Sequence, residues 1–201
     1  WRRGSAGDAR PPGCHPAGVT LRRAAALLLV VLLTSGSGFG VVGDSVTHDA
    51  REELTARRGI VFSAPGVFIR TGRPGLREHV RAGRERIVVE LGLMDVSFFA
   101  APAELERRIR PVLRDDLAGV DCVVWVDLKT TAPVHEDWPA RSRQFNALLT
   151  RLTGEYGAHV ARWSVHSSGH RAWFRPDGIH LRPSGQRAYA RFVAGQVIRH
   201  C

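Results

Sequence analysis

The sequence predicts a three-layer α/β/α fold in which helices cover both faces of a five-stranded parallel sheet. Short apolar segments alternate with amphipathic segments of helical length from Phe39 onward, a pattern typical of parallel sheets. The 201 residues leave room for one such domain with a proper core. Because crossovers are right-handed, few topologies remain, and we expect the flavodoxin-like strand order 2-1-3-4-5.

The first half of the domain is expected to place two helices between three strands. The first helix ends before Gly59, where we expect the left-handed cap position. The run Ile87-Val88-Val89 marks the third strand as buried. In chain order these elements are a strand at 39–43, a helix at 46–58, a strand at 60–64, a helix at 74–84 and a strand at 86–91.

The second half is expected to place three helices around two further strands. Pro102 suits the first position of a helix, and Pro111 should kink or split that helix. Phe145, Leu148 and Leu152 share one face of a long helix. In chain order these elements are a helix at 102–118, a strand at 122–128, a helix at 139–156, a strand at 159–163 and a helix at 183–200.

Residues 1–38 are expected to precede the domain, which we place at 39–201. Residues 1–18 are rich in Gly, Pro and Arg without a hydrophobic period, and we expect disorder there. Basic residues, the apolar run Ala24–Leu33 and small residues then form the three-part pattern of a secretory signal. The run is too short to span a bilayer. We therefore expect a secreted or cell-surface protein without stable membrane insertion after signal removal. The alternative is a helix packed on the domain of a cytoplasmic protein.

The chain is strongly basic, with a formal net charge of +10, and Lys129 is its only lysine. Nucleic-acid sites need clustered positive charge, whereas these arginines are scattered along the chain. We therefore expect no nucleic-acid partner. The three cysteines, Cys14, Cys122 and Cys201, have the spacing of neither a zinc site nor a disulfide framework. We expect Cys122 in the core as a thiol and the other two free.

A serine directly after the first strand is the first candidate for chemistry. Gly43-Asp44-Ser45 ends this strand and opens the next helix. At such a turn a hydroxyl can face the crevice at the carboxyl ends of the strands, and backbone N–H groups point into the same space. The alternative is that Ser45 only caps the helix.

The second candidate is Asp177-Gly178-Ile179-His180, in the loop before the last helix. A serine hydroxyl needs a base to take its proton, and an imidazole is suited to this task. The base needs an acceptor on its other nitrogen, which Asp177 can supply. The alternative is a solvated loop histidine beside a capping aspartate. Because both candidates fall where such a sheet binds ligands, we predict Ser45 as nucleophile, His180 as base and Asp177 as the group that orients it.

Two blocks of the chain resemble the SGNH/GDSL hydrolases, and most closely the small bacterial SGNH domains attached to acyltransferases of cell-surface polysaccharides. Val41–Thr47 is similar to their nucleophile block and Asp177–Gly185 to their closing block, and the resemblance covers about residues 39–200. It implies an esterase, deacetylase or O-acyltransferase for short acyl esters, above all acetyl esters of a carbohydrate or similar small substrate. It implies no cofactor and no metal. The adjacent residues at 135–137 are also poorly suited to a metal site, because neighbouring side chains point in different directions. We expect a monomer.

The resemblance also implies an oxyanion hole, formed by the backbone N–H groups of Ser45 and of a glycine after the second strand. Gly66 is the first choice because it follows that strand in Ala64-Pro65-Gly66, and Gly72 is the second. The further residues expected at the substrate site are Asp44, His48, Gly92, Met94 and Trp173.

One position departs from the family pattern. The third block of the family is Gly-x-Asn-Asp, whereas this chain has Gly92-Leu93-Met94-Asp95. The asparagine amide donates a hydrogen bond to the oxyanion, and a thioether cannot, which costs about 2.7–4 kcal/mol. The sequence therefore predicts a hydrolase of weak activity. The alternative is a catalytically impaired binding module for acetylated or anionic glycans.

Overall fold

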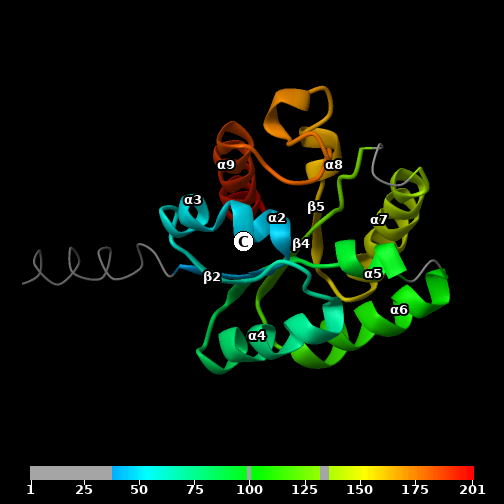
Figure 1. The fold of residues 1–201 in the computed structure, drawn as a ribbon. Helices are drawn as coiled ribbons and strands as arrows, with labels where there is room; N and C mark the ends of the chain where they lie inside the picture. Colours follow the sequence, from blue (N-terminus) through cyan, green and yellow to red (C-terminus); the bar gives the residue numbers. More distant parts are fainter. Residues whose placement is uncertain (1–37, 99–100, 132–135) are drawn as a thin grey trace, which may run out of the picture. The chain divides into compact units, whose positions relative to one another are not determined.

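The computed structural model describes residues 38–98, 101–131 and 136–201. Five parallel strands form one sheet in the order β2-β1-β3-β4-β5, which confirms the predicted fold class and topology (Figure 1). The strands are β1 (Phe39–Gly43), β2 (Gly59–Ser63), β3 (Arg86–Glu90), β4 (Cys122–Val126) and β5 (His159–Ala161). The disorder and signal predictions for residues 1–37 lie outside the described residues.

Helices cover both faces of the sheet, as Figure 1 shows. On one face lie α4 (Ile69–Arg81), α6 (Pro102–Pro111) and α7 (Trp138–Glu155), and on the other α3 (Arg51–Thr55) packs against α9 (Pro183–His200). The shorter elements are α2 (Ser45–Asp49), α5 (Leu93–Phe98), the π-helical turn η1 (Val112–Asp116), α8 (Trp163–His166) and the 3-10 turn η2 (Arg171–Trp173). None of the described helices is both long and apolar enough to cross a bilayer.

The core lies between the sheet and these helices. Every residue of β1 and β4 is buried, as expected for central strands covered on both faces. Trp125 is fully buried, and its Nε1–H donates to the carbonyl oxygen of Leu91 at 3.1 Å. A buried residue of this size needs such a partner for its one polar atom. The core thereby fixes the carboxyl end of β3, where the candidate site begins.

Two predicted helix boundaries are wrong. The helix expected at 46–58 is two short helices that meet at Ala50, and the left-handed residue is Arg58, with φ 67°, rather than Gly59. Gly59 instead begins β2, where a Cβ would lie 2.9 Å from the carbonyl oxygen of Leu54. The helix expected at 74–84 begins already at Ile69, because the carboxylate of Asp95 accepts the Ile69 N–H at 2.8 Å and satisfies the first turn.

The other predicted elements agree with the structure within a few residues, although α5, α8 and η2 were not expected. The helix predicted at 102–118 splits at Pro111, after which η1 follows, as the proline suggests. The predicted last helix has the bounds of α9. The predicted fifth strand is shorter, since β5 ends at Ala161.

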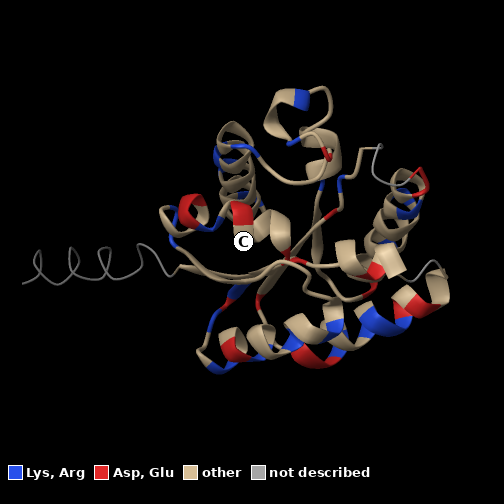
Figure 2. Cartoon of the chain, in the orientation of Figure 1, with Lys and Arg blue, Asp and Glu red and all other residues tan. Residues whose placement is uncertain are grey.

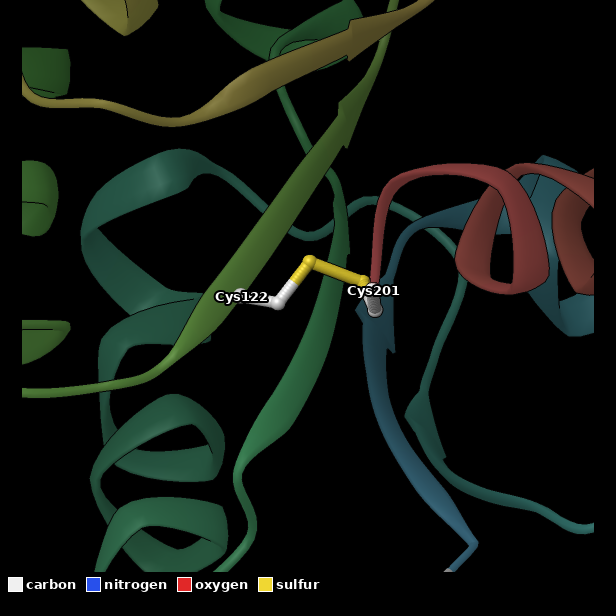
Figure 3. Close-up of a disulfide and its surroundings, with 2 residues drawn as sticks. All are labelled: Cys122 and Cys201. Carbon is white, nitrogen blue, oxygen red and sulfur yellow. A yellow bond between two sulfur atoms is a disulfide. The ribbon is translucent and has the colours of Figure 1, made fainter.

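Cys122 is buried as predicted, but the expectation that it and Cys201 are free thiols is wrong, because the two form a disulfide (Figure 3). Cys14 lies outside the described residues. Their Cα atoms lie 5.6 Å apart across a sequence separation of 79 residues. The bond joins the first residue of β4 to the residue that follows α9. Spacing along the chain could not reveal this pair, since only the tertiary fold brings the two residues together.

Candidate active site

Ser45 lies at a tight turn between β1 and α2. Asp44 is the N-cap residue of α2, and its Oδ1 accepts the N–H of Val46 at 3.1 Å. Ser45 is therefore the first helical residue, 9% exposed, at the carboxyl edge of the sheet. Gly43 permits the turn, because a Cβ there would lie 2.2 Å from Thr47 Oγ1. The predicted strand-to-helix placement of Ser45 is confirmed.

Asp177 and His180 form an oriented pair in the loop before α9. Asp177 Oδ2 lies 2.9 Å from His180 Nδ1, and Asp177 Oδ1 accepts the N–H groups of Ile179 and His180 at 2.8 and 2.9 Å. Partial burial raises the pKa of Asp177, but these hydrogen bonds outweigh it and hold the pKa below its ordinary value. Asp177 is thus an ionised acceptor that leaves Nε2 of His180 available.

A glycine shapes this loop. Gly178 has φ 70°, and a Cβ there would lie 1.8 Å from Thr131 Oγ1. Thr131 Oγ1 donates to the Gly178 carbonyl oxygen at 3.1 Å, which ties the loop to the segment after β4. Only glycine satisfies both the conformation and the close approach.

The loop is joined to the helix of Ser45 through Asp49. Asp49 lies one helical turn after Ser45, so both residues share a face of α2. Its carboxylate accepts the N–H of Leu181 at 2.9 Å and binds the guanidinium of Arg175 at 3.0 Å. Within the described part of the chain, however, no hydrogen bond joins His180 Nε2 to Ser45 Oγ.

A second carboxyl group lies beneath the nucleophile turn. Glu90, at the end of β3, is buried, and its Oε2 accepts the N–H groups of Asp44 and Thr47 and the hydroxyl of Thr47, at 3.0–3.3 Å. The Thr47 hydroxyl also forms a hydrogen bond with the hydroxyl of Tyr189 on α9, at 3.2 Å. Strand β3, the first turn of α2 and α9 are thereby joined in one buried network.

Burial raises the pKa of both carboxyl groups in this network. The pKa of Asp44 rises to about 6, and that of Glu90 rises well above its ordinary value because burial and the charge of Asp44 both oppose its ionisation. Asp44 Oδ2 is buried without a donor when both groups are ionised. A proton on Glu90 would supply that donor, in keeping with the raised pKa of both carboxyl groups.

The two candidate glycines of the oxyanion hole differ in the structure. Gly66 is exposed, has φ 76° and has open space where a Cβ would stand, in the turn after β2. Gly72 lies inside α4, where its N–H donates to the Phe68 carbonyl oxygen at 3.0 Å and a Cβ would lie 2.6 Å from Leu91. Gly72 is therefore a packing residue, and its choice as an oxyanion donor is wrong. Gly66 remains a prediction.

The segment after β3 carries Gly92, Met94 and Asp95. Gly92 has φ 133°, and a Cβ there would lie 2.3 Å from the ring of Phe145. The half-buried Met94 lines a cavity of about 410 Å³ with Phe98 and other residues of α5 and α7. Asp95 instead points into the protein, where it binds Ile69 N–H and burial raises its pKa. Asp95 thus fixes the start of α4.

His48 and Trp173 have partners within the protein. His48 Nδ1 lies 3.3 Å from the carbonyl oxygen of Ser63 at the end of β2. The indole of Trp173 stacks between His170, at 3.8 Å between ring centroids, and Trp163, at 5.8 Å. These ring contacts cover part of the half-buried Trp173. A substrate role for either residue remains a prediction.

The sequence patterns did not predict a role for Asp49 or Glu90, nor the structural role of Asp95. A signal exists for Glu90, a lone acid that ends the buried run Ile87–Val89 beside the carboxyl edge of the sheet. No signal exists for Asp49, since its partners lie more than 120 residues away in sequence. Within the described residues no group of three His, Cys, Asp or Glu side chains could hold a metal ion. Residue 135 lies outside them.

No protein-family model and no curated protein matches the sequence. Solved structures do match the fold. The C-terminal catalytic domain of peptidoglycan O-acetyltransferase A from Streptococcus pneumoniae superposes with a TM-score of 0.66 and 15% identity, over 82% of this chain and 93% of that one. An acetylxylan esterase from Geobacillus stearothermophilus gives a TM-score of 0.67 and 14% identity, over 81% and 94%.

A GDSL-like lipase from Bacteroides thetaiotaomicron also matches, with a TM-score of 0.66 and 11% identity, over 89% of this chain and 98% of that one. These likenesses show that the chain has the SGNH/GDSL hydrolase fold. At such low identity they establish the fold alone, since one fold hosts many activities.

Proposed function

We propose that this protein hydrolyses or transfers short acyl groups, above all acetyl, from esters of a carbohydrate or a similar small alcohol. Ser45 is the nucleophile, His180 the general base and Asp177 the residue that orients His180. One observation carries the proposal: the oriented Asp177–His180 pair is joined by Asp49 to the helix that begins at Ser45. The fold shared with esterases and an O-acetyltransferase supports it.

The mechanism follows from these positions. Ser45 Oγ attacks the ester carbonyl carbon while His180 Nε2 takes its proton, and the N–H groups of Ser45 and Gly66 stabilise the oxyanion. His180 returns the proton to the departing alcohol, which leaves an acyl-serine. Water or an acceptor hydroxyl then attacks that ester, again with proton removal by His180. The Ser45–His180 contact forms with substrate, since such contacts are often longer in ligand-free sites.

The test is labelling of the purified protein with a fluorophosphonate probe, together with hydrolysis of 4-nitrophenyl acetate. We expect labelling and turnover in the wild type and neither in Ser45→Ala. Ser168→Ala removes an exposed hydroxyl elsewhere and should behave as wild type. Turnover that survives Ser45→Ala, or a wild type that neither labels nor turns over, would refute the proposal.

A second candidate function is a non-catalytic binding module for acetylated or anionic glycans, and Met94 is the observation that favours it. A thioether stands where the family pattern has an oxyanion donor. Met94→Asn distinguishes the two. An increase of roughly a hundredfold or more in esterase rate indicates a weakened hydrolase. No turnover in either form, with measurable binding of an acetylated oligosaccharide, indicates the module.

Export also belongs to this proposal. The protein contains the Cys122–Cys201 disulfide. Disulfides form and persist in oxidising compartments and are rare in cytosolic proteins. It therefore supports the secreted or cell-surface location that the apolar run at 24–33 suggests. Fractionation of the native host, with the protein recovered outside the cytoplasm, is the expected result.

A further inference from the structure

A basic pocket adjoins the loop that carries His180. It has a volume of about 590 Å³ and lies between the segment after β4 and the loops that flank η2. Its cationic side chains are Lys129, Arg171, Arg175 and Arg182, and polar atoms are added by Thr131 and His170. No Asp or Glu is found among the described residues that line it. The pocket is thus open space surrounded by positive charge.

These cations differ from the arginines of the opposite helices. Both α6 and α7 carry acidic as well as basic residues (Figure 2), and Arg108, Arg110 and Arg151 are bound to glutamates. Lys129 and Arg171 have no ion pair within the described residues, and the loops between α8 and α9 carry blue segments in Figure 2. Arg175 alone among the four binds a carboxylate, that of Asp49. Lys129 also borders a second, small cavity together with the buried Asp127, so the pocket's positive charge is compensated only in part.

The pocket is linked to the elements of the candidate active site in three ways. Gly178, two residues before His180, forms part of its wall. Arg175 donates its backbone N–H to the His180 carbonyl oxygen at 2.7 Å and its guanidinium to Asp49 on the helix of Ser45. Lys129 also lines a small cavity bounded by Val46 and Glu90, beneath the nucleophile turn. The residues of this pocket are therefore tied to the His180 loop and to the helix that begins at Ser45.

We infer that the ester substrate carries an anionic group, a carboxylate or a phosphate, on the part that occupies this pocket. The inference rests on the proposed function for its catalytic step. Lysine and arginine attract such groups at long range, and the guanidinium fork matches both geometrically. The cations act on substrate capture and leave the chemistry at Ser45 unchanged, so their effect appears in KM and weakens with salt.

The test compares three esters of matched shape: 4-acetoxybenzoate, 4-acetoxyphenyl phosphate and the neutral 4-acetoxybenzamide. In low salt we expect kcat/KM of the wild type for at least one anionic ester to exceed that for the amide by about tenfold, with the ratio near one in high salt. Whichever anionic ester gives the larger ratio identifies the anionic group. Lys129→Gln and Arg171→Gln should each lower the ratio by roughly threefold or more, through KM.

Arg81→Gln is the matched control, because Arg81 is an exposed cation at the end of α4, on the other side of the sheet. It should leave the ratio unchanged. A wild-type ratio at or below one, or equal effects of all three substitutions, would overturn the inference. Arg171 lies on an exposed turn, so Arg171→Gln serves if Lys129→Gln fails to fold.

A binding measurement separates this inference from the proposed function. Calorimetry with inorganic pyrophosphate in low salt needs no turnover. We expect binding to the wild type and to Arg81→Gln, and at least fivefold weaker binding to the double variant Lys129→Gln/Arg171→Gln. If no ester is hydrolysed but this pattern holds, the catalytic proposal fails and the anion site stands. Equal affinities in all three proteins overturn the anion site.

Discussion

The carboxylate of Asp49 accepts the backbone N–H of Leu181 at 2.9 Å. This hydrogen bond spans 132 residues of sequence and joins the helix that begins at Ser45 to the residue directly after His180. The placement of the His180 loop against the helix of Ser45 therefore depends in part on Asp49. A shift of about 1 Å between nucleophile and base can cost a hundredfold in rate.

Replacement of Asp49 should reduce catalysis more than stability. We expect Asp49→Ala to lower kcat by about ten- to a hundredfold, because the His180 loop loses its tie to α2. Asp49→Asn retains an acceptor oxygen for Leu181 N–H and should lose less. Steady-state kinetics with 4-nitrophenyl acetate and thermal unfolding check this. Glu52→Ala removes an exposed acid nearby and is the control; an equal loss of kcat there would contradict the prediction.

Asp177→Asn should leave the loop in place but impair the base. The amide oxygen can still accept the backbone N–H groups of Ile179 and His180, whereas the charge that fixes the imidazole tautomer is lost. We expect kcat to fall by roughly 10³–10⁴-fold with a nearly unchanged melting temperature. A fall of less than tenfold would show that Asp177 does not orient the base.

The Asp44–Glu90 pair should make folding stability depend on pH. Both carboxyl groups have raised pKa values in the folded state, that of Asp44 about 6. The folded protein thus binds more protons than the unfolded chain. The associated stability is present below about pH 4, the unfolded pKa, and is lost as pH rises through the folded values.

Glu90→Gln removes one of these titrations and retains an amide that can donate to Asp44. Relative to wild type, the variant should gain about 1–2 kcal/mol of unfolding free energy between pH 5 and pH 8. Urea denaturation at the two pH values measures this difference. Glu52→Gln, at an exposed position, should show no such gain. A difference between Glu90→Gln and wild type that is the same at both pH values would contradict the raised pKa values of this pair.

Loss of the disulfide should affect stability and spare catalysis. The double variant Cys122→Ser/Cys201→Ser opens a loop of 79 residues and should lose about 2–4 kcal/mol of unfolding free energy. The bond lies at the amino end of β4, whereas Ser45 lies at the carboxyl edge of the sheet. We therefore expect unchanged kcat below the melting transition. A reduced kcat in the folded variant would contradict this separation.

The sequence predicted those features that local patterns encode. Alternating apolar segments predicted the sheet order, and Gly43-Asp44-Ser45 predicted a serine at the first strand-to-helix turn. Asp177 and His180 are three residues apart, so their pairing follows from a short loop. Pro111 marked a helix break that needs no tertiary information.

Features that depend on distant partners were not predictable in this way. Asp95 accepts the N–H of Ile69, the first residue of α4, which lies 26 residues earlier in the sequence. At position 72, a side chain would collide with Leu91, which favours glycine there. Cys122 lies near Cys201 because α9 packs against the sheet. In each case the residue type is ordinary at its own position, and its role arises from a neighbour that the fold supplies.

The position of Met94 has a practical consequence. It is the only methionine of the sequence and borders the cavity beside the segment after β3. A sample labelled with carbon-13 at the methionine methyl would therefore give one resonance from the natural sequence, located where the departure from the family pattern occurs. That single signal would report local environment during ester binding and acylation, without any introduced probe.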